Sequence, residues 1–177
     1  MPRLFTGIEI PADVSAALTA YRGGLSGARW VEPKNYHITL RFIGDIDEGL
    51  ARDIVQTLGD RRPREPIEVT LDGLSAFGGS KPRSVHARAK ATPALADLHA
   101  EQERLVERVG LEPEGRKFKP HVTLARLKGA SAEDVARYLA ERPFPPLTFT
   151  ATRLVLYSSK ASVGGGPYVV EAAYPFA

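Results

Sequence analysis

The pattern His-x-Thr-Leu occurs twice in this chain, as His37-Ile38-Thr39-Leu40 and as His121-Val122-Thr123-Leu124. In a β-strand, His and Thr two residues apart project to one face, while the apolar residues beside them project to the other. Each copy can therefore anchor an aliphatic pair in a core and present an imidazole and a hydroxyl to a cleft. Two copies predict one site shared by two strands.

The rest of the sequence predicts alternating strands and helices around these two segments. Strands are expected at 4–10, 36–43, 67–77, 84–89, 121–127, 147–158 and 168–174, the last two joined by a loop at Gly164-Gly165-Gly166, and helices at 11–22, 47–58, 92–109 and 131–141.

Each half of the chain then holds strands, two helices and one His-x-Thr-Leu strand. This repetition predicts an α+β, bilobal, duplicated fold, in which two mainly antiparallel sheets face a central cleft with helices packed outside. We expect a single domain over residues 1–177, with pseudo-symmetric lobes at roughly 1–80 and 81–177.

The composition predicts a soluble globular protein with a sizeable core. Of the 177 residues, 43% are hydrophobic and 25% charged, and no apolar run is long enough to span a bilayer. The first residues lack the zones of a secretory signal, so a cytoplasmic protein without a membrane partner is expected. The absence of cysteine excludes a disulfide framework, a thiolate nucleophile and cysteine zinc sites.

The net charge is mildly basic, at +3. This value is compatible with an anionic substrate but too small to argue for extensive binding along a phosphate backbone. Several cations are expected to cluster near the repeated motif: Arg41, Lys81, Arg83, Arg116, Lys117, Lys119 and Arg126.

Two histidines in one cleft suit the hydrolysis of a phosphodiester. Because the ordinary pKa of histidine is near ~6.5, one imidazole can accept the proton of the attacking water while the other protonates the departing oxygen. The hydroxyls of Thr39 and Thr123 would donate hydrogen bonds to the non-bridging phosphate oxygens. This scheme needs no metal and no cofactor.

The flanking residues make the chain resemble the 2H phosphoesterase superfamily, specifically the RNA 2′,3′-cyclic phosphodiesterases, also called 2′-5′ RNA ligases. The resemblance is carried by Arg3-Leu4-Phe5 with Ile8 and Pro11, Trp30-Val31, His37 to Gly44, Phe118 to Arg126 and Leu156 to Ser159. It implies opening of a terminal 2′,3′-cyclic phosphate to a 2′-phosphomonoester. With an RNA 5′-hydroxyl in place of water, the same site would form a 2′-5′ linkage.

The resemblance also implies roles for single residues. His37 would be the proton donor to the departing 3′ oxygen, His121 the proton acceptor from water, and Arg126 a phosphate contact. Strand alternation places Arg126 on the face opposite His121, so that contact requires a bulge, a twist or the end of the strand. The expected partner is RNA with a 2′,3′-cyclic phosphate end, or a cyclic nucleotide, bound by a monomer.

Other interpretations stay open at this point. Thr39 and Thr123 suit any strand, His86 and His99 are interpreted as ordinary structural histidines, and Phe118 as a packing residue rather than a base-stacking one. Arg41 shares the predicted face of His37, so it is either a substrate contact or solvated surface. The glycine triplet lacks a P-loop lysine and is not expected to hold a phosphate. The rival functions are a non-catalytic nucleotide or RNA-end binding module and a metal hydrolase with both histidines as ligands.

Overall fold

The computed structural model describes residues 2–159 and 167–177 and contains four α-helices and a large antiparallel sheet. In the described residues the strands are β1 (Arg3–Glu9), β2 (Ala28–Trp30), β3 (His37–Asp45), β4 (Ile67–Phe77), β5 (Ser84–Ala89), β6 (His121–Leu127), β7 (Leu147–Ala151), β8 (Arg153–Ser159) and β9 (Tyr168–Pro175). The helices are α1 (Ala12–Leu18), α2 (Glu48–Leu58), α3 (Pro93–Arg108) and α4 (Ala132–Ala140), with short 3₁₀ turns at Thr19–Tyr21 and Pro33–Asn35.

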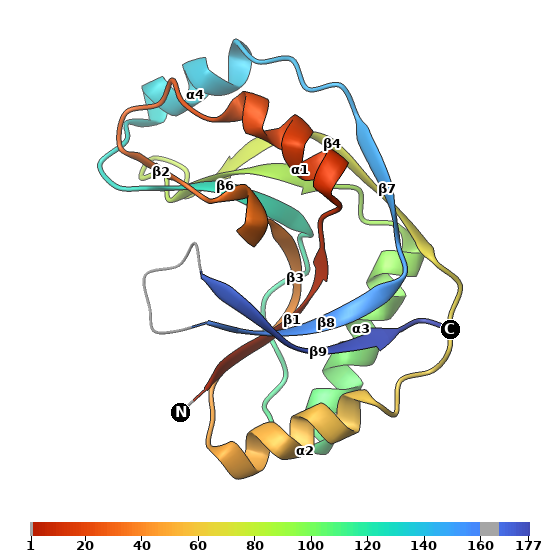
Figure 1. Ribbon diagram of the computed structural model, residues 1–177. Helices are drawn as coiled ribbons and strands as arrows, with labels where there is room; N and C mark the ends of the chain where they lie inside the picture. Colours follow the sequence, from red (N-terminus) through yellow and green to blue (C-terminus); the bar gives the residue numbers. More distant parts are fainter. Residues whose placement is uncertain (1, 160–166) are drawn as a thin grey trace.

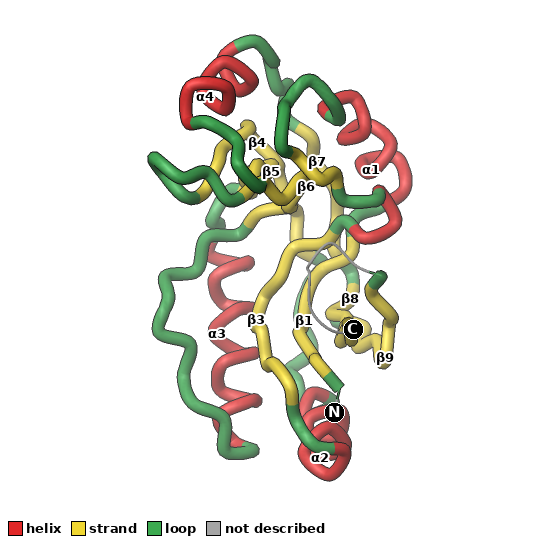
Figure 2. The backbone as a smooth tube through the Cα atoms, turned by 90° about the vertical axis from the view of Figure 1, so that its left-hand side faces the viewer, coloured by secondary structure: helices red, strands yellow, loops and turns green. Residues whose placement is uncertain are grey.

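The expectation of two sheets is wrong, because the described strands form one nine-stranded sheet. Its order is β7-β4-β5-β6-β3-β1-β8-β9, with β2 beside β6. Two arms of this sheet meet where Ile38 of β3 pairs with Val122 of β6. Helices α1 and α4 lie over the arm that contains β6, whereas α2 and α3 lie along the arm that contains β3 (Figures 1 and 2).

The arms do not follow the expected halves of the sequence. Strands β2 and β4 come from the first 80 residues but belong to the arm of β6, while β8 and β9 come from the second half and belong to the arm of β3. The strand expected at 147–158 is two strands, because the chain passes at Thr152 from β7, beside β4, to β8, beside β1. The expected loop at Gly164–Gly166 lies outside the described residues.

Three of the helix starts are fixed by side-chain caps. The side chains of Asp47, Thr92 and Ser131 each accept a hydrogen bond from the backbone N–H three residues later, at the starts of α2, α3 and α4. These bonds satisfy donors that have no partner inside a helix. No described helix is long and apolar enough to cross a membrane.

The aliphatic half of each His-x-Thr-Leu pattern enters the core, as predicted. Ile38, Leu40, Val122 and Leu124 are all at most 4% exposed. Their burial fixes the register of both strands, because a slip of one residue would move these four side chains to the other face. The polar half of each pattern is therefore held on the opposite face of the sheet.

Candidate active site

The two histidine strands meet at their motifs. In antiparallel pairing around Ile38 and Val122, His37 comes opposite Thr123, and Thr39 comes opposite His121. The polar residues of both motifs are partly buried, whereas the residues between them are fully buried. The sequence prediction that the two motifs share one site is consistent with this register, which relates them by a local twofold axis.

A bulge at the last residue of each motif changes which side chains face the site. Along β3, Gly7 of β1 pairs with Thr39 and Thr6 with Arg41, so Leu40 is the extra residue. Along β6, His86 of β5 pairs with Thr123 and Val85 with Ala125, so Leu124 is the extra residue. Each bulge inverts the alternation that follows it. The fourth residue after each histidine is consequently buried and the fifth is exposed, in both strands.

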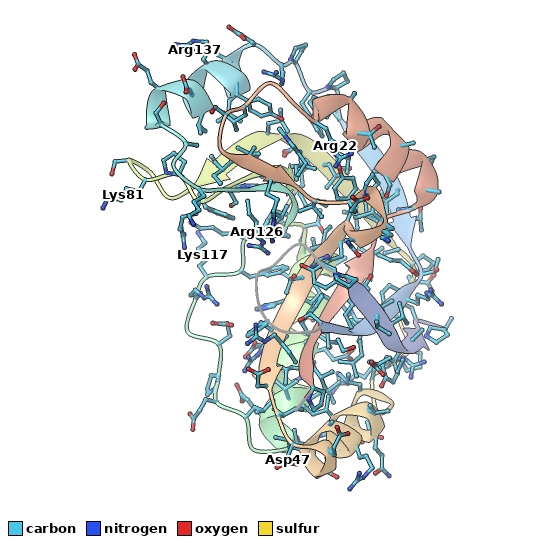
Figure 3. The ribbon with its side chains drawn as sticks, turned by 60° about the vertical axis from the view of Figure 1, so that its left-hand side comes forward. Arg22, Asp47, Lys81, Lys117, Arg126 and Arg137 are labelled. Atoms are coloured by element: carbon cyan, nitrogen blue, oxygen red, sulfur yellow. The ribbon has the colours of Figure 1, made fainter. Side chains whose placement is uncertain are left out.

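Arg126 therefore lies on the same face of β6 as His121. A phosphate contact by Arg126 required a bulge, a twist or the end of the strand, and the bulge at Leu124 meets this requirement. It is also close enough to repel both protonated histidines, since it contributes to the lowered pKa of His37 and of His121. Figure 3 shows Arg126 on the same side of the molecule as Lys117 and Lys81.

The bulge at Leu40 in β3 makes both expectations for Arg41 wrong. Arg41 is neither a substrate contact nor solvated surface, because its side chain is buried against α3 and the loop that follows it. Its Nε lies 2.6 Å from Oε1 of Glu103, and its guanidinium also donates to the carbonyl oxygens of Phe42, at 2.6 Å, and Glu112. Arg41 thus ties the motif strand to the neighbouring helix and loop.

Both motif histidines are oriented by the same backbone contact. Nδ1 of His37 donates to the carbonyl oxygen of Asn35 at 2.9 Å, and Nδ1 of His121 donates to that of Lys119 at 2.6 Å. A carbonyl can only accept, so the proton of the neutral ring is on Nδ1 and the lone pair is on Nε2. The Thr39 hydroxyl donates to Nε2 of neutral His37 at 3.0 Å.

Aromatic side chains enclose His37. The ring centroids of Phe5, Tyr168 and Tyr157 lie 4.8, 4.9 and 5.5 Å from that of His37. Burial lowers the pKa of His37 to about 4, with further lowering by the positive charges of His121 and Arg126 and an opposing effect of the bond to Asn35. His37 is therefore neutral around pH 7 in the free protein.

A third histidine lies beside the second motif, and sequence reasoning missed it. His86 of β5 is 3% exposed, and its ring centroid is 4.9 Å from that of His121. Phe77 of β4 contacts both rings, at 4.2 Å from His86 and 4.9 Å from His121. Burial lowers the pKa of His121, as does the charge of Arg126, while the bond to Lys119 raises it. The strand at 84–89 was predictable, but its position beside β6 was not.

The remaining candidates lie outside the site. Phe118 is partly buried and stacks on His99, with ring centroids 4.1 Å apart, in agreement with the packing interpretation. Among the described residues, no three His, Asp or Glu side chains converge as the ligands of a metal would.

Gly7 allows β1 to approach the first motif closely, and its replacement gives a first testable prediction. A Cβ at Gly7 would lie 2.6 Å from the carbonyl oxygen of Ile38 and 3.3 Å from the Tyr157 ring. We expect Gly7→Ala to lower the free energy of unfolding by about 1–3 kcal/mol, because β1 must move away from β3. Urea titration measures this, with Gly115→Ala as the control because a Cβ there meets nothing within 4 Å. Equal stability of the two variants would contradict the close contact.

The fold and site define a class of α+β protein, in which one antiparallel sheet presents two His-x-Thr strands side by side. The family model described as the 2′-5′ RNA ligase superfamily matches residues 10–162, and the chain belongs to this family of 2H phosphoesterases.

Similar proteins agree with this assignment. The RNA 2′,3′-cyclic phosphodiesterase of Methanothermobacter thermautotrophicus is 33% identical over 138 residues, which cover 75% of this chain and 74% of that protein. The one from Aeropyrum pernix is 42% identical over 102 residues, which cover 56% of this chain and 57% of that protein. A crystal structure of a Thermus thermophilus protein superimposes with a TM-score of 0.78 at 26% identity, covering 98% and 97% of the two chains. E. coli LigT with 3′-AMP gives 0.77 at 25%, covering 99% and 98%.

Proposed function

We propose that this chain hydrolyses RNA 2′,3′-cyclic phosphate ends to 2′-phosphomonoesters with two histidines and no metal, and that it joins 2′-5′ RNA ends in the reverse direction. The observation that carries the proposal is the pair of equivalent histidines whose Nδ1 atoms are fixed by backbone carbonyls, which makes Nε2 the proton-transfer atom of each ring. In the free protein Nε2 of His37 accepts from the Thr39 hydroxyl, which we propose turns to the phosphate when substrate binds. The names of the relatives support the same reaction, and the 3′-AMP complex of LigT supports a nucleotide ligand. We propose that a monomeric single domain performs it, in a cleft between the two arms.

In the proposed reaction, Nε2 of His121 accepts a proton from water as the water oxygen attacks phosphorus. The bond from phosphorus to O3′ breaks, and His37 gives its Nε2 proton to that oxygen. Thr39 and Thr123 donate hydrogen bonds to the non-bridging oxygens, and the Arg126 guanidinium offsets their negative charge. Proton exchange with water returns both histidines to their starting states. For ligation, an RNA 5′-hydroxyl replaces water as the attacking group, its proton goes to His121, and the O3′ of the 2′,3′-cyclic end again leaves with the proton of His37.

The proton-donor role of His37 has a measurable consequence. A donor must be protonated, but burial holds the pKa of His37 at about 4 in the free protein. An anionic phosphate close to the ring favours the charged imidazolium and raises this pKa. We expect the decline of kcat at high pH to occur at a higher pH than the decline of kcat/KM, because kcat reports the bound state and kcat/KM the free protein. Coincident declines in the two profiles would argue against His37 as the donor.

Hydrolysis of a 2′,3′-cyclic nucleotide in the presence of a chelator tests the proposal against both alternatives. Full turnover in excess chelator is expected, because the described site consists of proton donors and acceptors. Activity that vanished in chelator and returned with added metal would favour a metal hydrolase. Calorimetric binding of a 2′-phosphonucleotide without any turnover would favour a binding module.

The cations around β6 predict that kcat/KM depends on the length of the RNA. Lys81, Arg83, Lys117, Lys119 and Arg126 are exposed, and none of the five forms an ion pair within the described residues. We expect Lys81→Glu with Lys117→Glu to lower kcat/KM for an oligonucleotide with a cyclic end. The slope of log kcat/KM against log salt concentration should become less steep by roughly 0.7 for each phosphate contact that is lost.

A cyclic mononucleotide has no further phosphates to bind, so the same double variant should hydrolyse it normally. Arg52→Glu is a control for the reversal of a single surface charge, to be compared with Lys81→Glu and Lys117→Glu made one at a time, since Arg52 is exposed on α2, which lies at the other end of the molecule (Figure 1). Equal losses for the short and the long substrate would show that these lysines do not bind the RNA chain.

A further inference from the structure

His86 is a buried titratable side chain that the proposed reaction does not use. It lies in β5 opposite Thr123 of β6, and it is enclosed by Phe77 on one side and by His121 beside it. Its Nδ1 is buried and has no hydrogen-bond partner among the described residues.

An unpartnered buried nitrogen is unfavourable for folding, because its interaction with water is lost without replacement. A phenylalanine in the same place would fill the space without that cost. What His86 gives its surroundings is therefore the contact made by its flat ring, not a hydrogen bond at Nδ1. Its contacts are a phenylalanine and the histidine that is the proposed proton acceptor.

We infer that His86 is a positioning residue for His121, which together with Phe77 holds the His121 ring in the orientation that directs Nε2 to the reacting phosphate. The inference rests on the proposed function and adds to it a residue outside the two motifs. On the other arm, Phe5, Tyr157 and Tyr168 enclose His37 in a similar way. Each histidine would then be held at Nδ1 by a carbonyl and at its ring faces or edges by flat side chains.

The His86 ring also affects the protonation of His121. It excludes water from one side of His121 and stays neutral itself, since burial and the charges of His121 and Arg88 lower the pKa of His86 to about 4. The other groups facing His121 are Arg126 on its own strand, Arg88 opposite it on β5 and His37 on β3. Arg88 is paired with Asp72, with Nε 3.3 Å from Oδ1. Removal of the His86 ring would therefore admit water to His121 and raise the pKa of His121.

Two variants separate positioning from general support of the fold. His86→Ala removes the ring, whereas His86→Phe keeps a flat ring without a titratable group. We expect His86→Ala to lower kcat on a cyclic nucleotide by roughly 10- to 100-fold, with KM changed by less than about threefold. The low-pH decline of kcat/KM should move to higher pH. His86→Phe should restore kcat to within about threefold of the unchanged protein.

Nuclear magnetic resonance titration of His121 in the free protein supplies a readout that does not require turnover. We expect its pKa to rise in His86→Ala and to stay lowered in His86→Phe. If the unchanged protein had no activity, the proposed function would fail while this titration still tested the contact. Unchanged kcat and unchanged His121 pKa in folded His86→Ala would overturn the inference, as would a His86→Phe variant as impaired as His86→Ala. If His86→Ala does not fold, His86→Leu replaces it, with kcat again expected to fall.

Discussion

Replacing either His37 or His121 by alanine is expected to lower the turnover of a 2′,3′-cyclic phosphate by about 10²- to 10⁴-fold, the usual contribution of one general acid or base. Each variant should stay folded, because both histidines are only partly buried and the aliphatic residues beside them hold the strands. Steady-state kinetics and circular dichroism on the same samples measure the two effects.

His99→Ala is the matched control for these variants. His99 is also a partly buried histidine stacked on an aromatic ring, but its partner is Phe118 and it lies on α3, away from the motifs. We expect His99→Ala to retain turnover within a few-fold. Near-normal turnover in a folded His37→Ala or His121→Ala variant would exclude the two-histidine mechanism.

The two arginines that follow the motifs are expected to respond in opposite ways to replacement by glutamine. Arg41→Gln should lower the free energy of unfolding by roughly 3 kcal/mol, because it breaks a largely buried ion pair and removes the arginine that neutralises Glu103. Arg126→Gln should change stability by less than about 0.5 kcal/mol, since Arg126 is exposed. Its kcat/KM should fall by about 10²-fold, because a positive charge at the phosphate is lost.

Urea unfolding and kinetics on both variants check this contrast. The folded fraction of Arg41→Gln should hydrolyse substrate at nearly the normal rate per folded molecule. The contrast depends on the two bulges, so an Arg41 variant that lost activity without losing stability would show that the alternation along β3 had been assigned wrongly.

Much of the local structure was predictable, because it depends on neighbours in the sequence. Hydrophobic periodicity and the caps Thr92 and Ser131 locate helices to within a few residues. The pairing of the two motif strands agrees with the prediction drawn from the repeated four-residue pattern. The burial of Ile38 and Leu40 follows from simple strand alternation.

The features that were missed depend on contacts between distant segments. Nothing in the sequence between 147 and 158 indicates that the chain changes arms at Thr152. A bulge is defined by the register of a partner strand, which the sequence of one strand does not show. Simple alternation therefore placed Arg41 on the wrong face of β3, and it placed Arg126 on the face of His121 only if a bulge was assumed. His86 acquires its neighbour only when β5 pairs with β6, which a single-strand pattern does not reveal.

The most direct test of the two-histidine mechanism is the identity of the product formed from an RNA with a 2′,3′-cyclic phosphate end. The RNA is incubated with the protein in chelator, and phosphorus nuclear magnetic resonance identifies the product. Protonation of the 3′ oxygen by His37 predicts a 2′-phosphomonoester as the only product. The same product should form far more slowly with His37→Ala. A 3′-phosphomonoester, or no opening of the ring at all, would contradict the proposed roles of the two histidines.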